Sequence, residues 1–404
     1  MTQYKIERLN HHGKGVAEGP VFVPRVLPGE LVTGRLNGTD LEDVKVLTPS
    51  SDRVRAPCRH YNACGGCALQ HASDAFVENW KAQAVQTALA ANGISIEIPK
   101  VFTSNASTRR RAKLSGRRTK SGAIVGFHAR GSNTVVEIPD CTVLAPEILA
   151  ALPMLGDVTK KVCSRKGEIQ FQVTVTVNGL DVLVLGAREV SAIEQAELAA
   201  ITRSFGIARL TWGNDLLAGE NPAAIPMGAA LVTPPPGSFL QATQEGERAL
   251  VEFVRHHAGS AKRAVDLFAG SGTFSFPMAE TCDVHAVEGD RAMMDAVDAG
   301  WRQSKGLHKV TTETRDLFRR PLMADELRHF DCAVIDPPRA GAEAQIKHIA
   351  ESDLETVVMI SCNPVTFSRD AKHLVAAGFT LENLNVVDQF RWSPHIEIAA
   401  NFSR

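Results

Sequence analysis

The chain has 404 residues, of which 44% are apolar and 22% charged. One hydrophobic core rarely supports so many residues, so we expect two or three domains. Nothing approaches the about 18 consecutive apolar residues of a membrane span, and residues 1–5 lack the apolar core of a signal peptide. We therefore expect a cytoplasmic protein without membrane contact, and we expect it to be a monomer. The formal net charge of −1 leaves nucleic-acid binding to local basic patches.

Residues 1–50 consist of short apolar runs separated by glycine and proline. Runs at residues 21–23 and 30–34 flank the turn-forming pair Pro28 and Gly29. Short strands at this spacing predict a five-stranded barrel, and the alternative is a barrel that serves only as a spacer.

A group of cysteines follows the predicted barrel. Three of them lie within ten residues: Cys58, Cys64 and Cys67. A tetrahedral or cubane metal site needs a fourth ligand, for which Cys141 is the best candidate and Cys163 and His60 are weaker ones. Zinc and a [4Fe–4S] cluster both accept four thiolates. The long first spacing and the distant fourth cysteine fit the cluster better than zinc, and unrelated free thiols are the remaining alternative.

Four segments after these cysteines carry local structural signals. Residues 74–92 predict a helix, residues 168–185 a β-hairpin, and residues 191–204 a second helix. The proline-rich segment 234–237 predicts a rigid break in the chain, which we take as a domain boundary.

The stretch between Glu97 and Glu137 is basic. It has no acidic residue, and its arginines include Arg109, Arg110, Arg111, Arg117 and Arg118. Arginine contacts with phosphate supply much of the sequence-independent affinity for nucleic acids, so the stretch predicts an RNA-binding track. The alternative is a solvated basic hairpin.

After residue 237 the pattern changes to alternating strands and helices, which predicts an α/β domain. A strand at residues 263–268 runs into the glycine-rich loop 269–273, and the next strand ends at Glu288. A carboxylate at that position is placed to bind ribose hydroxyls. The loop lacks the third glycine of the dinucleotide signature, so an adenosine-type cofactor fits better than a nicotinamide one.

Three further strands end in polar or reactive residues. Asp316 closes the third strand, Asp336 follows the fourth, and Cys362 follows the apolar strand 357–360. Open α/β sheets place their ligands at the carboxyl ends of the strands, so Cys362 is a candidate nucleophile. The alternative is a buried apolar filler, because free cysteine is among the most buried residue types.

These motifs resemble those of the RNA uracil-5-methyltransferases, which use S-adenosylmethionine, and the resemblance covers nearly the whole chain. The matching residues are 266–272, Glu288, Asp316, 336–339, 361–364 and 394–397. Residues 13–30 resemble the TRAM domain, an OB-like barrel found on RNA-modifying enzymes. The four-cysteine pattern resembles the ribosomal-RNA branch of the family, which carries a [4Fe–4S] cluster.

The resemblance implies three domains and a reaction. We expect a TRAM-like OB-type barrel at residues 1–50, a central α+β iron–sulfur and RNA-binding domain at 51–236, and a Rossmann-like methyltransferase domain at 237–404, on which helix 74–92 can pack. The implied activity is methylation of carbon 5 of a uridine in structured RNA, with 23S ribosomal RNA favoured. The alternatives are a transfer-RNA uridine-5-methyltransferase, a base-amino methyltransferase and a non-catalytic iron–sulfur RNA-binding protein.

The resemblance also implies the ligands of each cofactor. The residues that would bind S-adenosylmethionine are Gln241, Phe268, Gly270, Gly272, Thr273, Glu288, Asp316 and Asp336. Thr273 occupies a position that is often asparagine or glycine in the family. The cluster ligands would be Cys58, Cys64, Cys67 and Cys141.

The chemistry explains why a thiol and a carboxylate are needed. A thiolate that adds to carbon 6 of uracil turns the ring into an enolate, whose carbon 5 can attack a methyl group. Cys362 is the implied nucleophile. A base must then remove the hydrogen from carbon 5, and Glu397 is the implied general base. Cytosine-5 RNA methyltransferases usually take their nucleophile from the fourth-strand motif, and residues 336–338 contain no cysteine, which argues against cytosine.

Overall fold

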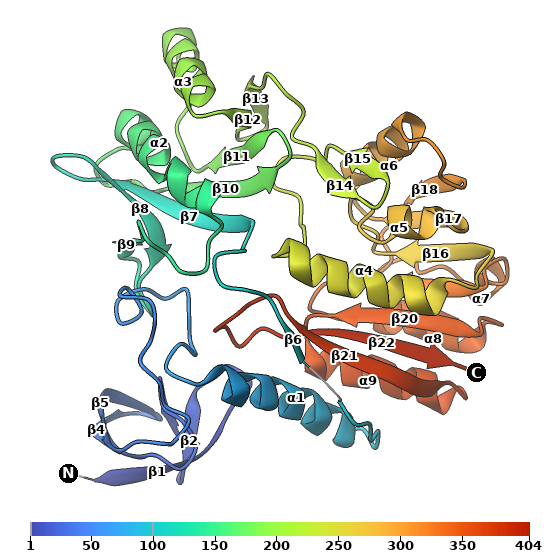
Figure 1. Ribbon diagram of the computed structural model, residues 1–404, viewed down its shortest axis with the longest axis horizontal. Coiled ribbons are helices and arrows are strands. Elements are labelled where there is room, and N and C mark those ends of the chain that lie inside the picture. The colour runs from blue at the N-terminus through green and yellow to red at the C-terminus, as the bar shows by residue number, and fades with distance from the viewer. Residues whose placement is uncertain (1, 99–100) are drawn as a thin grey trace.

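The computed structural model describes residues 2–98 and 101–404, which form a small barrel, a central sheet domain and a larger α/β domain. In Figure 1 the barrel lies at the lower left, the central sheet at the upper left and the α/β domain at the right. Each part has its own group of buried apolar side chains. The chain is therefore built around several cores, as its length predicts.

Five short strands close into the N-terminal barrel, in the order β1-β2-β3-β5-β4. They are β1 (Gln3–Leu9), β2 (Gly15–Ala17), β3 (Val21–Val23), β4 (Leu31–Asn37) and β5 (Asp40–Thr48). Aliphatic side chains such as Ile6, Val23 and Val32 fill its interior. The five-stranded barrel predicted from the glycine and proline spacing is confirmed.

A seven-stranded sheet of order β13-β12-β11-β10-β7-β8-β9 forms the central domain. Its elements are β7 (Arg111–Arg118), β8 (Ala123–His128), β9 (Val135–Glu137), β10 (Ile169–Thr176), β11 (Gly179–Leu185), β12 (Ile207–Trp212), β13 (Asp215–Ala218), α2 (Pro146–Val162) and α3 (Ala192–Ser204). The predicted hairpin is present as β10 and β11, which pair Thr176 with Gly179. Gly179 has φ of +119°, a conformation that residues with a side chain rarely adopt.

An eight-stranded sheet of order β18-β17-β16-β19-β20-β22-β21-β6 forms the α/β domain. Its elements from the second half of the chain are β16 (Arg263–Leu267), β17 (Asp283–Glu288), β18 (Val310–Thr314), β19 (Cys332–Ile335), β20 (Thr356–Ser361), β21 (Thr380–Asp388), β22 (Glu397–Ser403), α4 (Gln244–Ala258), α5 (Ser275–Ala279), α6 (Arg291–Gln303), α7 (Ala324–Leu327), α8 (Glu343–Glu351) and α9 (Pro364–Ala376). Side chains of α4, α5 and α6 pack on one face and those of α8 and α9 on the other. The parallel strands β16 to β20 share one carboxyl edge, where open α/β sheets bind ligands.

Two segments from the first half of the chain complete this domain. Strand β6 (Val101–Thr103) pairs in parallel with β21, and helix α1 (Asp74–Ala90) packs against α9. The helix buries Lys81 completely, and its Nζ lies 2.6 Å from Asp388 Oδ1 and 2.8 Å from the carbonyl oxygen of His395. The ion pair ties α1 to the end of β21, and the hydrogen bond ties it to the loop between β21 and β22.

A short hairpin in front of the proline-rich break also belongs to the α/β domain. It consists of β14 (Ile225–Met227) and β15 (Ala230–Val232), whose apolar ends are buried in the same core as α4 and α6. The core therefore begins before residues 234–237, where the sequence predicted the boundary. The reason is that both strands bury apolar side chains in this core and that β15 packs against α6.

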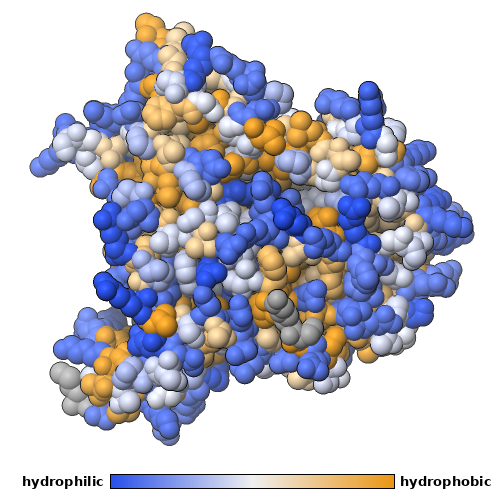
Figure 2. All heavy atoms as spheres, viewed as in Figure 1, coloured by the Kyte–Doolittle hydropathy of each residue, from blue (hydrophilic) through white to orange (hydrophobic). Residues whose placement is uncertain are grey.

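Polar side chains cover most of the face seen in Figure 2, and apolar ones lie in scattered groups. Two of the larger exposed apolar side chains, Phe239 and Phe318, line a cavity at the strand ends of the α/β domain. Within residues 2–98 and 101–404, no helix combines the length and the apolar character needed to cross a bilayer.

Candidate active site

One cavity of about 560 Å³ opens at the carboxyl edge of the α/β sheet. Of the residues that the sequence assigns to cofactor binding or catalysis, these line it: Gln241, Phe268, Gly270, Thr273, Glu288, Asp316, Asp336, Cys362 and Glu397. They come from several strand ends and from the segment before α4. Only the folded sheet brings them together.

The loop after β16 forms part of the cavity wall. Phe268 has φ of +61°, a left-handed conformation that is rare for a bulky residue and that turns the chain sharply out of the strand. Gly270 lines the cavity, and the space at its missing Cβ is open. Gly272 does not line the cavity. A Cβ there would lie 2.6 Å from the ring of Phe276, so this glycine allows close packing of α5 rather than contact with a cofactor.

Two acidic side chains are held at the edge of the cavity by backbone amides. Glu288, at the end of β17, accepts hydrogen bonds from the N–H groups of Gly270 at 3.1 Å and Gly289 at 2.6 Å. Asp316 lies two residues beyond β18 and accepts from the N–H group of Phe318 at 3.0 Å. These carboxylates offer fixed acceptors for the hydroxyl and amine groups of an adenosine-type ligand.

Cys362 and Glu397 meet in the cavity because β20 and β22 are neighbouring strands. Cys362 follows the last residue of β20, and Glu397 is the first residue of β22, which pairs antiparallel with β20. The thiol is half-buried, whereas Glu397 is 3% exposed. A thiol and a carboxyl group thus line one cavity.

Burial changes the proton affinity of both groups. Together with smaller contributions from the negative charges of Glu397 and Asp336, it raises the pKa of Cys362 to about 11. Burial also raises the pKa of Glu397 to about 7, against the hydrogen bond from Gln389 and the charge of Arg339. The carboxyl group therefore titrates near neutral pH, where the thiol is mostly protonated.

Further aromatic and basic residues also line the cavity: Arg109, Phe239, Arg339, Phe390 and His395. Arg339 and His395 belong to the matched motifs, whereas Phe390 belongs to none of them. Phe239 is 52% exposed, and the guanidinium of Arg111 lies 4.5 Å from its ring centroid. The guanidinium of Arg109 lies 5.7 Å from the ring of Phe390. Exposed rings beside cations are surfaces on which nucleic-acid bases stack. Aromatic residues in loops show no periodicity, so only the basic run could have pointed to this surface.

The arginines of the basic stretch lie in different environments. Arg110 is 4% exposed and pairs with Glu247 on α4. Arg117 pairs with Glu168 at 2.7 Å, while Arg118 is exposed. The prediction that the whole run contacts phosphate is therefore wrong for Arg110, whose charge joins the central domain to α4.

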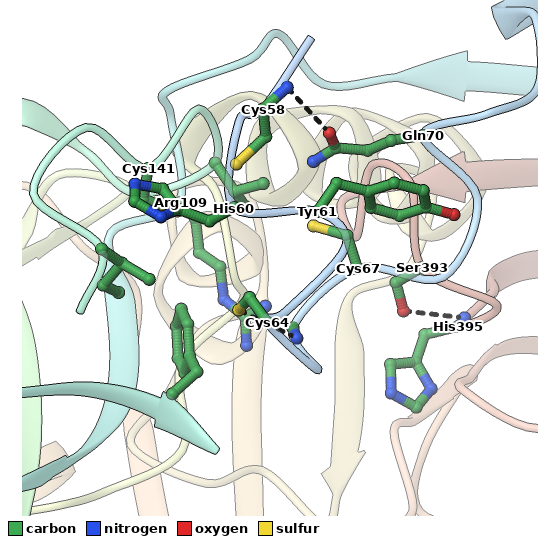
Figure 3. A pocket seen from close by; sticks show the side chains of 14 residues that line it. Cys58, His60, Tyr61, Cys64, Cys67, Gln70, Arg109, Cys141, Ser393 and His395 are labelled. Atoms are coloured by element: carbon green, nitrogen blue, oxygen red, sulfur yellow. Dashed lines mark hydrogen bonds between the residues drawn. The ribbon is translucent and has the colours of Figure 1, made fainter. Parts of the chain in front are cut away.

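A second cavity, of about 230 Å³, collects the four predicted cluster ligands, Cys58, Cys64, Cys67 and Cys141 (Figure 3). Cys163 does not line this cavity. The thiol of Cys163 lies 3.4 Å from the carbonyl oxygen of Ser164 instead. His60 lines the cavity, but its Nε2 is bonded to Asp140. Among the described residues, no three His, Cys, Asp or Glu side chains are placed to hold a single metal ion.

The two cavities share a wall. Arg109 and His395 line both of them, and Figure 3 shows Arg109 among the cysteines of the smaller cavity. His395 lies in the loop between β21 and β22, and its carbonyl oxygen accepts a hydrogen bond from Lys81. The cysteine loop is therefore next to the larger cavity, because Arg109 and His395 separate the two spaces.

Comparison with known proteins finds relatives along the whole chain. A family model described as tRNA (uracil-5-)-methyltransferase matches residues 232–404. An uncharacterised RNA methyltransferase of Mesorhizobium japonicum is 40% identical over 99% of this chain and 97% of its own length. The 23S rRNA (uracil(1939)-C(5))-methyltransferase RlmD of Halomonas elongata is 31% identical over 97% of this chain and 87% of its own length. The fold matches that of Pyrococcus abyssi tRNA (uracil-54, C5)-methyltransferase in complex with S-adenosyl-L-homocysteine, with a TM-score of 0.78 over 99% of both chains and 21% identity.

The sheet order, the glycine-rich loop and the carboxylate at the end of the next strand define a methyltransferase of the α/β type. The full-length relatives then narrow the class, and the chain belongs to the RNA uracil-5-methyltransferase family. This membership supports S-adenosylmethionine as the cofactor and confirms the resemblance drawn from the motifs.

Proposed function

We propose that this enzyme methylates carbon 5 of a uridine in structured RNA, with 23S ribosomal RNA as the favoured substrate. The observation that carries the proposal is the meeting of Cys362 and Glu397 in the cavity that also contains the predicted cofactor residues. A base-amino methyltransferase would have no use for Cys362. The relative at 31% identity supports ribosomal RNA over transfer RNA. The cytoplasmic location and the monomeric state stay predictions.

In the proposed reaction the thiol of Cys362 gives its proton to solvent water, and the thiolate adds to carbon 6 of uracil. The electron pair of the 5,6 double bond moves toward the oxygen on carbon 4 and forms an enolate. S-adenosylmethionine, when bound, supplies the electrophilic methyl group for carbon 5. Glu397 then takes the proton from carbon 5, the electrons of that C–H bond restore the double bond, and Cys362 leaves as a thiolate.

The cavity residues proposed to hold S-adenosylmethionine are Gln241, Phe268, Gly270, Thr273, Glu288, Asp316 and Asp336. Glu288 occupies the strand end at which α/β folds bind ribose hydroxyls. The open space beside Gly270 lets a ligand approach the backbone closely. Gly272 is left out of this set because it faces Phe276 instead.

The cysteine cavity fits a [4Fe–4S] cluster better than a zinc ion. Zinc–sulfur bonds of ~2.3 Å place four thiolates about 3.8 Å from one another around a single ion. No three described ligands are placed for one ion, although all four cysteines line the cavity. The four thiolates of a cubane each bind a different iron, so they lie farther apart. We propose these four residues as the cluster ligands: Cys58, Cys64, Cys67 and Cys141.

The proposed function predicts the loss of one modified base when the gene is deleted. Total RNA from the deletion strain should lack 5-methyluridine at a single ribosomal position, because the thiol proposed to activate carbon 5 there is lost with the protein. Mapping of modified nucleotides by mass spectrometry measures this directly, and a wild-type copy of the gene should restore the base. An unchanged set of 5-methyluridines, with an amino-methylated base missing instead, would contradict the proposal.

The cluster predicts a coloured protein. Enzyme purified without air should be brown, with broad absorption near ~400 nm, as expected of iron bound to four thiolates. Cys141→Ser should lose most of the iron, since one ligand is removed. Cys163→Ser is the matched control, because Cys163 is buried in the same domain but does not line the cavity. Zinc with negligible iron in the anaerobic wild-type protein would contradict the cluster.

A further inference from the structure

A buried glutamine connects the two sides of the catalytic cavity. Gln389 follows β21 and is 2% exposed. Its Nε2 lies 3.0 Å from Glu397 Oε2 and 2.5 Å from Gln241 Oε1. Its Oε1 lies 2.6 Å from the backbone nitrogen of Ala242. Both ends of this amide are therefore bonded, one of them to the proposed general base.

The orientation of the amide follows from its partners. The N–H group of Ala242 can only donate, so the atom facing it must be the carbonyl oxygen of Gln389. The NH2 group of Gln389 therefore donates to both Gln241 and Glu397. Gln241 accepts with its own oxygen, which turns its NH2 group toward Asp336, whose Oδ2 lies 3.3 Å away. Two carboxyl groups are thus joined through two amides.

We propose that Gln389 is a positioning residue that holds the carboxyl group of Glu397 in one orientation and couples it to Gln241 on the cofactor side of the cavity. This inference rests on the proposed function, in which Glu397 takes the proton from carbon 5. An N–H donor aimed at a carboxyl oxygen favours the ionised form, which is the form that can accept a proton. Gln389 itself does not line the cavity, so it acts through Glu397 and Gln241.

The charged groups around Glu397 come from the neighbouring strand ends. Asp336 and Arg339 follow β19, and Cys362 follows β20. Burial raises the pKa of Glu397 to about 7, and the opposing contributions come from Gln389 and then from Arg339. The hydrogen bond from Gln389 lowers the pKa of Glu397, so removing this donor should raise that pKa further. The carboxylate is then less available at neutral pH and returns at alkaline pH.

Gln389→Glu is the sharpest test because it keeps the size of the side chain and an oxygen for Ala242 but removes the amide donors. The methylated RNA–protein adduct should form at the wild-type rate. It should resolve about fivefold more slowly at pH 7, which corresponds to a rise of one unit in the pKa of Glu397 from its value of about 7. The difference from wild type should shrink as the pH rises. Single-turnover formation and decay of the adduct on denaturing gels, from about pH 6 to about pH 9.5, measure both steps.

Two further variants complete the test. Gln389→Met removes the donors with an apolar side chain and should shift the profile in the same direction. Gln345→Glu is the matched control, because Gln345 is fully buried and bonds through both ends of its amide to the backbone of Leu322, away from the cavity. It should leave the profile unchanged.

Two outcomes would overturn the positioning role of Gln389. One is a wild-type profile in both Gln389 variants, and the other is an equal loss of adduct formation and resolution at every pH. Failure of the proposed function looks different. In that case no RNA adduct would form in any protein, including Glu397→Gln.

Discussion

Cys362→Ala is expected to abolish both the formation of 5-methyluridine and the covalent attachment of RNA to the protein. Without a thiolate on carbon 6, carbon 5 of uracil stays too weak a nucleophile to take a methyl group. Labelled RNA on a denaturing gel reports the adduct, and labelled methyl groups report the transfer. Binding of S-adenosylmethionine should persist, because Cys362 is not among the proposed cofactor residues.

The control for this variant is Cys282→Ala. Cys282 is 2% exposed, belongs to the same domain and does not line the cavity, so its loss changes packing but not the chemistry. It should keep wild-type activity. If Cys362→Ala itself kept wild-type methylation, the thiolate mechanism would be wrong, and methylation of a base amino group would become the favoured interpretation of the activity.

Adduct formation by the wild-type enzyme should also depend on pH. Because burial raises the pKa of Cys362 to about 11, only a small fraction of the free enzyme carries a thiolate at neutral pH. Below that pKa, each unit of pH raises the thiolate fraction about tenfold. Adduct formation in single turnover should therefore accelerate as the pH rises. A rate independent of pH would show that the thiol is deprotonated within the enzyme–RNA complex.

Glu397→Gln is expected to leave RNA attached to the protein. Cys362 can still attack and the methyl group can still be transferred, but the proton on carbon 5 has no base to accept it. Loss of a positioned base costs roughly 100- to 10,000-fold, so the methylated adduct should accumulate and be visible on a denaturing gel. Glutamine keeps the size of the side chain and an oxygen that can accept from Gln389.

The control here is Glu252→Gln, which removes an exposed carboxylate on α4 and should release product normally. Normal release by Glu397→Gln would exclude this residue as the base. His395 would be the next candidate, although burial lowers the pKa of His395 to about 4 and makes it a weak base. The same denaturing gel distinguishes the two residues, because only loss of the true base traps RNA.

The reactive strand ends could be predicted from the sequence because each follows a run of apolar strand-forming residues. Glu288 is the last residue of β17, and Cys362 directly follows β20, so each lies at the carboxyl end of a largely buried strand. The geometry of parallel sheets then places such residues at one edge without further information. The five-stranded barrel was predictable for a similar reason, since glycine and proline mark its turns.

Other residues depend on contacts that no local pattern encodes. Gln389 bonds to Gln241, which lies 148 positions away, and only the register of β21 beside the segment before α4 brings them together. Arg110 belongs to a basic run that looks solvated, yet α4 covers it and supplies Glu247 as its partner. Gly272 looks like part of a ligand loop, but its missing side chain makes room for the ring of Phe276.

The burial of Lys81 sets an order for folding during synthesis. The residue lies on α1, and the carbonyl oxygen that it bonds is 314 positions later, at His395. An ammonium group that leaves water before its partners exist costs several kcal/mol, so α1 cannot dock until the last strands have left the ribosome. The cysteine cavity cannot be complete before the same strands have emerged, because Ser393 and His395 form part of its wall. Helix α1 and the cysteine loop must therefore stay undocked, or be held by a chaperone, until the end of the chain has emerged, whereas the barrel has a core of its own and can fold earlier.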